Sequence, residues 1–137
     1  MPAFFHYACH VRSLEDAVKF YCDLLGCTKG RSTETWVDID FFGHQLSLHI
    51  GEPLATQPTG IVEGINVPMP HFGAILPSSE WHTLARKLDE ACVDFILKPT
   101  TRFEGEAGEQ NTMFFTDPSG NAIEIKGFTD MSGIFTA

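Results

Sequence analysis

Hydrophobic positions near the start of the chain follow first the period of a strand and then the period of a helix. After the alternating segment 6–11, apolar residues recur at three- and four-residue steps, at Leu14, Ala17, Val18, Tyr21, Leu24 and Leu25. These steps are typical of an amphipathic helix, and Gly26 lies where such a helix would end. Ser13 stands immediately before the helix, where serine is a favourable N-cap residue. The pattern predicts a strand followed by a capped helix.

The same pattern occurs again 65 residues later (71 − 6). His71 opens an apolar run and is followed seven residues on by Ser78, as His6 is followed by Ser13. A second helical stripe then comprises Trp81, Leu84, Ala85, Leu88 and Ala91. Shorter alternating runs follow both helices, at 35–41 and 45–50 in the first half and at 93–97, 112–116 and 121–126 in the second. Each half is therefore predicted to be a β-α-β-β-β unit with a capped helix.

The two units account for most of a single domain of residues 1–137. Module 1 covers about 3–50 and module 2 about 71–128, and residues 51–70 are rich in Pro and Gly without a clear period, which predicts a linker. A chain of 137 residues has the typical length of a single domain, so the two modules can share one hydrophobic core.

Composition narrows the classes of function. The formal net charge is −9 with only nine scattered Lys and Arg residues, which argues against a nucleic-acid partner. No apolar stretch approaches the roughly 20 residues of a membrane span. The N-terminus lacks the pattern of a signal peptide, so we expect a cytoplasmic protein without a membrane partner. The four cysteines show no CxxC spacing and are expected to be inert thiols.

Strand geometry brings three possible metal ligands to one surface. On the first strand, His6 and His10 share a face, and the more apolar alternate positions should meet the helices. His71 stands in the matching position of the second half. On the last strand, inward packing of its isoleucines turns Glu124 and Lys126 to the opposite side. Two imidazoles and a carboxylate suit Fe(II), Mn(II) or Zn(II), so His6, His71 and Glu124 are predicted metal ligands.

Three segments carry a resemblance to a known family. FHYACHVRSLEDAVKFYCDLLG, PHFGAIL and FFTDPSGNAIEIKGF resemble the vicinal oxygen chelate superfamily, which includes glyoxalase I, extradiol dioxygenases, fosfomycin-resistance proteins and bleomycin-resistance proteins. The likeness covers about 6–128, and FFGHQLSLH and FEGEAGEQNTMFFTDPSGN look most like a small branch of predicted extradiol-type dioxygenases. It implies an α+β fold in which two βαβββ modules form a partly closed eight-stranded sheet with helices outside. It also implies a homodimer, and it places the metal on the same three ligands.

One position departs from glyoxalase I. When the halves are aligned on their turn glycines, Ser47 falls opposite Glu124, where glyoxalase I has a glutamate ligand. Serine is a poor ligand for such metals, which leaves a position open for substrate. Gln45 and His49 share the predicted face of Ser47, and a one-residue bulge could bring either closer. Gln45, Ser47 and Lys126 are candidate substrate contacts, and the segment 98–111 is a candidate lid whose Arg102 is available to an anion.

These features predict a metal-dependent enzyme that acts on a small molecule with neighbouring oxygens. With Fe(II), which the dioxygenase likeness favours, O2 and a catechol would give extradiol ring cleavage, with His49 or His10 as proton shuttle. With Mn(II) or Zn(II), a non-redox lyase, isomerase or transferase reaction is expected. The alternative from another class is a metal-free binding protein like the bleomycin-resistance proteins, and the retained ligand trio counts against it.

Overall fold

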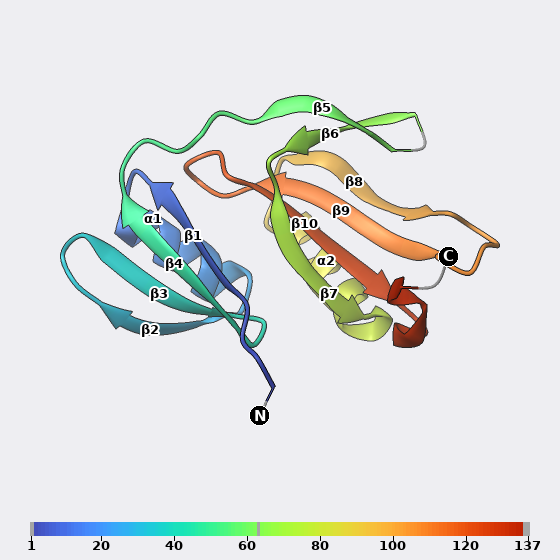
Figure 1. Ribbon diagram of the computed structural model, residues 1–137, viewed down its shortest axis with the longest axis horizontal. Coiled ribbons are helices and arrows are strands. Elements are labelled where there is room, and N and C mark those ends of the chain that lie inside the picture. Colours follow the sequence, from blue (N-terminus) through green and yellow to red (C-terminus); the bar gives the residue numbers. More distant parts are fainter. Residues whose placement is uncertain (1, 63, 136–137) are drawn as a thin grey trace. The chain divides into compact units, whose positions relative to one another are not determined.

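The computed structural model describes residues 2–62 and 64–135, and the chain divides into two compact units (Figure 1). Unit 1 comprises Met1–Ala55 together with Asp117–Asn121, and unit 2 comprises Thr56–Thr116 and Ala122–Ala137. The turn 117–121 thus belongs to unit 1, although the strands on both sides of it belong to unit 2.

Unit 1 is an open four-stranded sheet with one helix. Along the chain it contains β1 (His6–Val11), α1 (Leu14–Val18), a π-helical continuation η1 (Lys19–Leu24), β2 (Thr28–Ser32), β3 (Trp36–Phe41) and β4 (His44–Ile50). The strand order is β1-β4-β3-β2, and β1 runs parallel to β4. The Ser13 hydroxyl accepts the Asp16 N–H at 3.1 Å, and Gly26 has φ +78°, so both predicted ends of the first helix are confirmed.

Alternation along the strands divides the sheet of unit 1 into two faces. Val11, Val37, Ile39, Leu46 and Leu48 are almost fully buried, as is Tyr21 of the helical segment. The alternate positions of β1 are exposed, beginning with His6. The side that faces the helix therefore carries the hydrophobic core. The opposite side, which carries the histidines, lies outside that core and can present polar side chains to a ligand.

Unit 2 repeats this plan after a hairpin. It contains β5 (Gln57–Val62), β6 (Ile65–Met69), β7 (Phe72–Pro77), α2 (Ser78–Glu90), β8 (Phe95–Arg102), β9 (Gln110–Thr116), β10 (Ala122–Phe128) and a 3-10 helix η2 (Met131–Phe135). The sheet order is β7-β10-β9-β8, with β7 parallel to β10. Helix α2 packs on β10, where Trp81 Nε1 donates to the Ile125 carbonyl at 2.8 Å.

The predicted α+β class with two βαβββ modules is confirmed. The eight module strands form two separate four-stranded sheets, where one partly closed eight-stranded sheet was predicted, and the hairpin is a further two-stranded sheet. Strand β2 was not singled out from the sequence, because all five of its residues are exposed and show no alternation. The predicted linker 51–70 needs correction, since β5 and β6 pair within it from Gln57 to Met69. Hydrogen bonds between the backbones of β5 and β6 hold this segment in a hairpin, so its sequence needs no repeating hydrophobic pattern.

Two further local predictions are corrected. Helix α2 has Pro77 at its N-cap and no side-chain cap, so Ser78 is the first helical residue rather than its cap. The predicted lid is shorter than 98–111, because β8 continues to Arg102 and pairs with β9, which begins at Gln110. A register shift between Leu97 and Thr100 accommodates Pro99 in this edge strand.

Within residues 2–62 and 64–135, no helix has the length and apolar character needed to cross a membrane.

Candidate functional site

In unit 1, His6 is held at its Nδ1 atom. It lies on the exposed face of β1, as predicted, and its Nδ1 is 2.8 Å from Gln45 Oε1. An amide oxygen only accepts hydrogen bonds, so Nδ1 carries the proton and donates it. The Nε2 atom of the neutral ring then has a free lone pair, which is what a metal ligand requires.

Asp38 connects Gln45 to Ser47. Gln45 Nε2 donates to Asp38 Oδ2 at 3.4 Å, and Ser47 Oγ donates to Asp38 Oδ1 at 2.6 Å. Gln45 and Ser47 were predicted as substrate contacts, and the structure joins both of them to His6 through this network. Asp38 was missed by the sequence reasoning. Its signal is the alternation in WVDIDF, which turns it away from the buried Val37 and Ile39.

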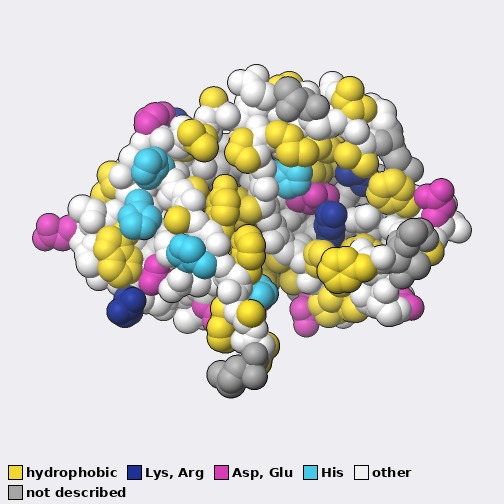
Figure 2. All heavy atoms as spheres, in the orientation of Figure 1, with side chains coloured by type: hydrophobic (Ala, Val, Ile, Leu, Met, Phe, Trp, Pro, Cys, Tyr) yellow, Lys and Arg dark blue, Asp and Glu magenta, His cyan; other side chains and the backbone are white. Residues whose placement is uncertain are grey.

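The other two predicted histidines lie on the same face of unit 1. The registers align His10 with His49 and His49 with Trp36, and the His49 and Trp36 rings are 6.4 Å apart. His10 Nδ1 donates to the Glu52 carbonyl at 3.2 Å, and its ring lies against Gly51. Figure 2 shows histidine side chains gathered over this unit. Their role as proton shuttles stays a prediction.

In unit 2, His71 and Glu124 contact each other. His71 Nε2 is 3.3 Å from Glu124 Oε1, and His71 Nδ1 donates to the Pro68 carbonyl at 2.7 Å. Glu124 is only 7% exposed, and its Oε2 accepts the Thr112 hydroxyl at 2.5 Å. Every polar atom of this pair except the facing Nε2 and Oε1 therefore has a separate partner among the described residues.

The pKa values of this pair move in opposite directions. The hydrogen bond with Glu124 raises the pKa of His71 above 6.5, while burial opposes the shift. Burial alone would raise the pKa of Glu124, but the hydrogen bonds from His71 and Thr112 and the charge of Lys126 lower it below 4.5. Each group thus favours the charge that attracts the other.

The donor set of unit 2 fits a divalent cation. With Nδ1–H committed to a carbonyl, a neutral His71 directs a lone pair at a carboxylate oxygen. Two lone pairs at this distance repel unless a proton or a metal ion lies between them. Imidazole nitrogen and carboxylate oxygen are both ligands for Fe(II), Mn(II) and Zn(II).

Strand register makes Ser47 the counterpart of Glu124. Ala8 on β1 pairs with Ser47, and Gly73 on β7 pairs with Glu124. Ala8 and Gly73 each lie two residues after the predicted histidine ligand of their module. The register agrees with the alignment on turn glycines, so the carboxylate of unit 2 has a hydroxyl as its equivalent in unit 1.

The predicted ligands are divided between the units. Unit 1 contains His6, and unit 2 contains His71 and Glu124. Among the described residues of the chain, no group of three or more His, Cys, Asp or Glu side chains surrounds one point. The metal trio therefore stays a prediction beyond the contact between His71 and Glu124.

Arg102 and Lys126 differ in their surroundings. Arg102 is 5% exposed, its Nη2 donates to the Val62 carbonyl at 2.9 Å, and its guanidinium lies over Phe103. Its predicted contact with an anion stays a prediction, and the group is in the interior of unit 2. Lys126 is partly exposed two residues after Glu124 on β10, so the two share a sheet face.

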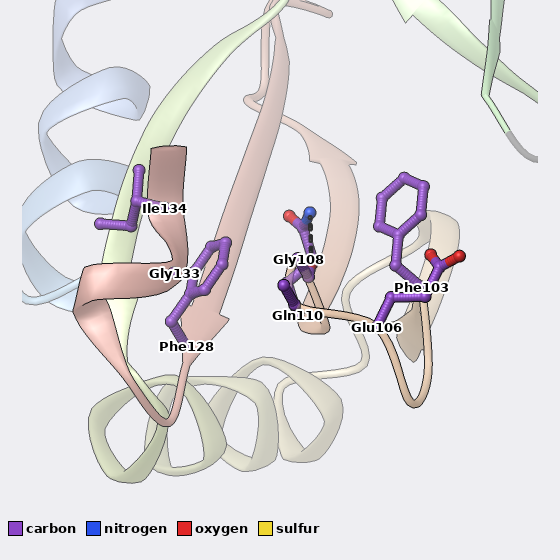
Figure 3. A pocket seen from close by; sticks show the side chains of 8 residues that line it. Phe103, Glu106, Gly108, Gln110, Phe128, Gly133 and Ile134 are labelled. Atoms are coloured by element: carbon purple, nitrogen blue, oxygen red, sulfur yellow. Dashed lines mark hydrogen bonds between the residues drawn. The ribbon is translucent and has the colours of Figure 1, made fainter. Parts of the chain in front are cut away.

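A pocket of about 500 Å³ lies in unit 2 at the C-terminal end of β10 (Figure 3). The loop between β8 and β9, the end of β10 and η2 form its walls, with the lining residues Phe103, Glu106, Ala107, Gly108, Gln110, Phe128, Gly133 and Ile134. By alternation, Phe128 shares the face of Lys126 and Glu124. The volume is within the range of small-molecule sites, about 300–1,000 Å³. Five of the lining residues, from Phe103 to Gln110, lie in the segment that was predicted as a lid, whereas Phe128, Gly133 and Ile134 were not predicted as site residues.

The family model of the Glyoxalase/Bleomycin resistance protein/Dioxygenase superfamily matches residues 3–125. The chain belongs to this superfamily. The resemblance seen in the sequence is thereby confirmed, and the superfamily's fold is the one described above. No curated protein matches the chain significantly.

Solved structures of this superfamily cover nearly the whole chain. A glyoxalase/bleomycin resistance protein/dioxygenase from Alicyclobacillus acidocaldarius is 28% identical, with a TM-score of 0.78 and coverage of 97% of this chain and 96% of that one. The fosfomycin resistance protein FosX from Listeria monocytogenes is 12% identical, with a TM-score of 0.68 and coverage of 98% and 99%. A lactoylglutathione lyase from Agrobacterium tumefaciens is 14% identical, with a TM-score of 0.67 and coverage of 98% and 97%.

Proposed function

We propose that this protein is a metal-dependent enzyme that acts on a small molecule able to chelate the ion through neighbouring oxygens. The observation that carries the proposal is the pair in unit 2. His71, with its Nδ1–H held by the Pro68 carbonyl, presents Nε2 to Glu124 Oε1 at 3.3 Å. A proton or a metal ion between the two atoms satisfies this arrangement, and membership of the superfamily supports a metal ion in that role.

His71 and Glu124, together with His6, would hold the ion. When bound, the ion would supply Lewis-acid stabilisation of negative charge on substrate oxygens. Thr112 fixes one carboxylate oxygen of Glu124, which leaves the other for coordination. Ser47 at the position equivalent to Glu124 supports three protein ligands rather than four and an open position for substrate.

The favoured reaction is extradiol-type ring cleavage of a catechol with Fe(II). The resemblance of FFGHQLSLH and FEGEAGEQNTMFFTDPSGN to predicted extradiol-type dioxygenases supports it. His10 and His49 also lie on the same face of unit 1 as His6, where a neutral imidazole can accept or return a proton. Lys126 would attract an anionic substrate oxygen. The pocket at the end of β10, lined by Phe128, would receive the carbon skeleton of the substrate.

A non-redox reaction with Mn(II) or Zn(II) is the second candidate. The same His and Glu donors suit these ions. The fosfomycin resistance protein and the lactoylglutathione lyase named above share the fold at 12% and 14% identity, so this fold is not restricted to dioxygenases. A homodimer is part of the proposal by family likeness, and a monomer mass from light scattering would contradict it.

Metal analysis tests the enzyme proposal directly. Protein purified without chelator, or reconstituted with Fe(II), Mn(II) or Zn(II), should hold about one equivalent of metal. The variants H6A and H71A should lose it, whereas H82A, which removes an exposed histidine of α2, should keep it. Binding of less than about a tenth of an equivalent by the unaltered protein would reject the proposal and favour a metal-free binding protein.

Oxygen uptake separates the two reactions. After anaerobic reconstitution with Fe(II), we expect O2 consumption with at least one member of a catechol panel and a coloured ring-cleavage product. Metal binding without oxygen uptake would favour the non-redox reaction.

A further inference from the structure

We propose that Ser47, Asp38 and Gln45 form a relay of hydrogen bonds that holds His6 in the tautomer able to bind a metal ion through Nε2. The proposal rests on the proposed function, and it assigns positioning roles to three residues that do not contact the ion. It also offers a role for Gln45 and Ser47 other than substrate contact.

The direction of each hydrogen bond follows from chemistry. As a carboxylate, Asp38 only accepts, so Ser47 Oγ at 2.6 Å and Gln45 Nε2 at 3.4 Å must both donate to it. With its amide nitrogen on Asp38, Gln45 turns Oε1 to His6 Nδ1 at 2.8 Å. This oxygen only accepts, so Nδ1 must carry the proton. The Nε2 lone pair of His6 is thereby left free.

The backbone sets the spacing of the relay. Asp38 aligns with Ser47 across β3 and β4, and His6 aligns with Gln45 across β1 and β4. All four side chains therefore lie on one face of three adjacent strands. Ser47 is only 6% exposed, so its hydroxyl gains more from the carboxylate than from water. The buried end of the relay thus anchors the exposed end at His6.

Unit 2 reaches the same tautomer by a different route. There, the Pro68 carbonyl accepts the Nδ1–H of His71 directly, and the carboxylate stands on β10 as Glu124. In unit 1 the equivalent of Glu124 is Ser47, and the carboxylate lies on the adjacent strand as Asp38. A carboxylate in that place cannot replace Glu124 as the equivalent ligand, but it can orient the Gln45 amide.

The first experiment measures the His6 tautomer by long-range proton–nitrogen NMR in metal-free protein at a pH where the ring is neutral. The unaltered protein should show Nδ1–H. In D38N, the new amide can offer its oxygen to Ser47 and its nitrogen to Gln45, which reverses the Gln45 amide. We expect His6 to change to Nε2–H in D38N and to lose its Nδ1–H preference in Q45L.

Two control variants separate the relay from general effects on the sheet. D40N changes a second aspartate of β3, whose Oδ1 accepts the Gly43 N–H at 2.8 Å, and it should leave the His6 tautomer unchanged. Q45E keeps an acceptor beside Nδ1, so it should retain the Nδ1–H form that Q45L loses. Circular dichroism of each variant checks that unit 1 is folded.

The second experiment titrates Zn(II) into the same proteins. Loss of the partner that orients a ligating histidine typically lowers metal affinity about 10–100-fold, and we expect this loss in D38N and Q45L but not in D40N. Unchanged tautomer and affinity in D38N and Q45L would overturn the relay. Failure of the unaltered protein to bind any metal would instead overturn the proposed function, because the tautomer is measured without metal.

Discussion

At the scale of single residues, the hydrogen-bond partners of buried polar groups such as Tyr21 and Glu124 decide what each group can do. Tyr21 is fully buried, and its hydroxyl donates to Asp117 Oδ2 at 2.8 Å. Asp117 Oδ1 accepts the N–H groups of Ser119 and Asn121, which fixes the turn between β9 and β10. The same rule applies to Glu124, whose carboxylate is oriented by Thr112 rather than by solvent.

The hydroxyl of Thr112 is expected to stabilise the protein through Glu124. Thr112 is fully buried, and T112V keeps its shape while removing the donor to a charged carboxylate. We expect the free energy of unfolding of metal-free protein to fall by about 1.5–3 kcal/mol, measured with urea. T112S, which retains the hydroxyl, should lose clearly less. Equal stability of T112V and the unaltered protein would contradict this role.

Two thiols predict a loss of stability at alkaline pH. Burial raises the pKa of Cys9 and of Cys27 from 9.0 to about 12. Because the folded pKa lies above the unfolded one, the native state keeps protons that the unfolded state releases. The contribution is fully present below pH 9 and should be lost as pH rises toward 12. Urea unfolding across this range should show a shallower decline in a C9A/C27A variant, and an identical slope would reject the prediction.

At the scale of elements, periodicity predicted the helices and most strands, because one face of each packs on a core. Strand β2 and the hairpin β5–β6 lack this signal, since backbone pairing orders them without a repeating apolar face. The extension of β8 to Arg102 was missed for the same reason. Ser13 was correctly predicted as a cap, whereas Ser78 falls inside its helix.

Strands β7 and β10 approach each other closely at Gly73. A Cβ atom at this position would lie 1.5 Å from the Glu124 carbonyl oxygen, so no side chain fits without moving a strand. We expect G73A to lower the free energy of unfolding by about 3 kcal/mol, because overpacking against backbone is not easily relieved. G30A on the exposed strand β2, where a Cβ would lie 3.3 Å from the Asp38 carbonyl oxygen, is the matched control. Similar effects of the two variants would argue against this constraint.

At the scale of the whole molecule, the chain contains one module in each of two units, and the predicted ligands are divided between them. His6 belongs to unit 1, while His71 and Glu124 belong to unit 2. If one metal ion binds to all three side chains, its binding free energy depends on both units. The increase in unfolding free energy that the ion causes should then require both His6 and His71.

Metal binding is therefore expected to stabilise the whole chain. At a free metal concentration about 100 times the Kd, the free energy of unfolding should rise by about 2.7 kcal/mol, and a chelator should reverse the gain. Thermal unfolding of H6A and of H71A should show no such gain, whereas H82A should keep it. Full stabilisation of H6A would show that unit 2 binds the ion without His6.

The sequence by itself determined the repeated strand and helix pattern, the first helix cap, and the strand faces that carry His6, His10 and Glu124. These follow from local period and turn chemistry, which act between residues close in the chain. Only the tertiary structure decided the partners of those side chains. Asp38 reaches Ser47 and Gln45, Thr112 reaches Glu124, and the Pro68 carbonyl holds His71 because strand pairing and turn geometry set their spacing. A period cannot reveal such contacts, since they depend on register between separate segments.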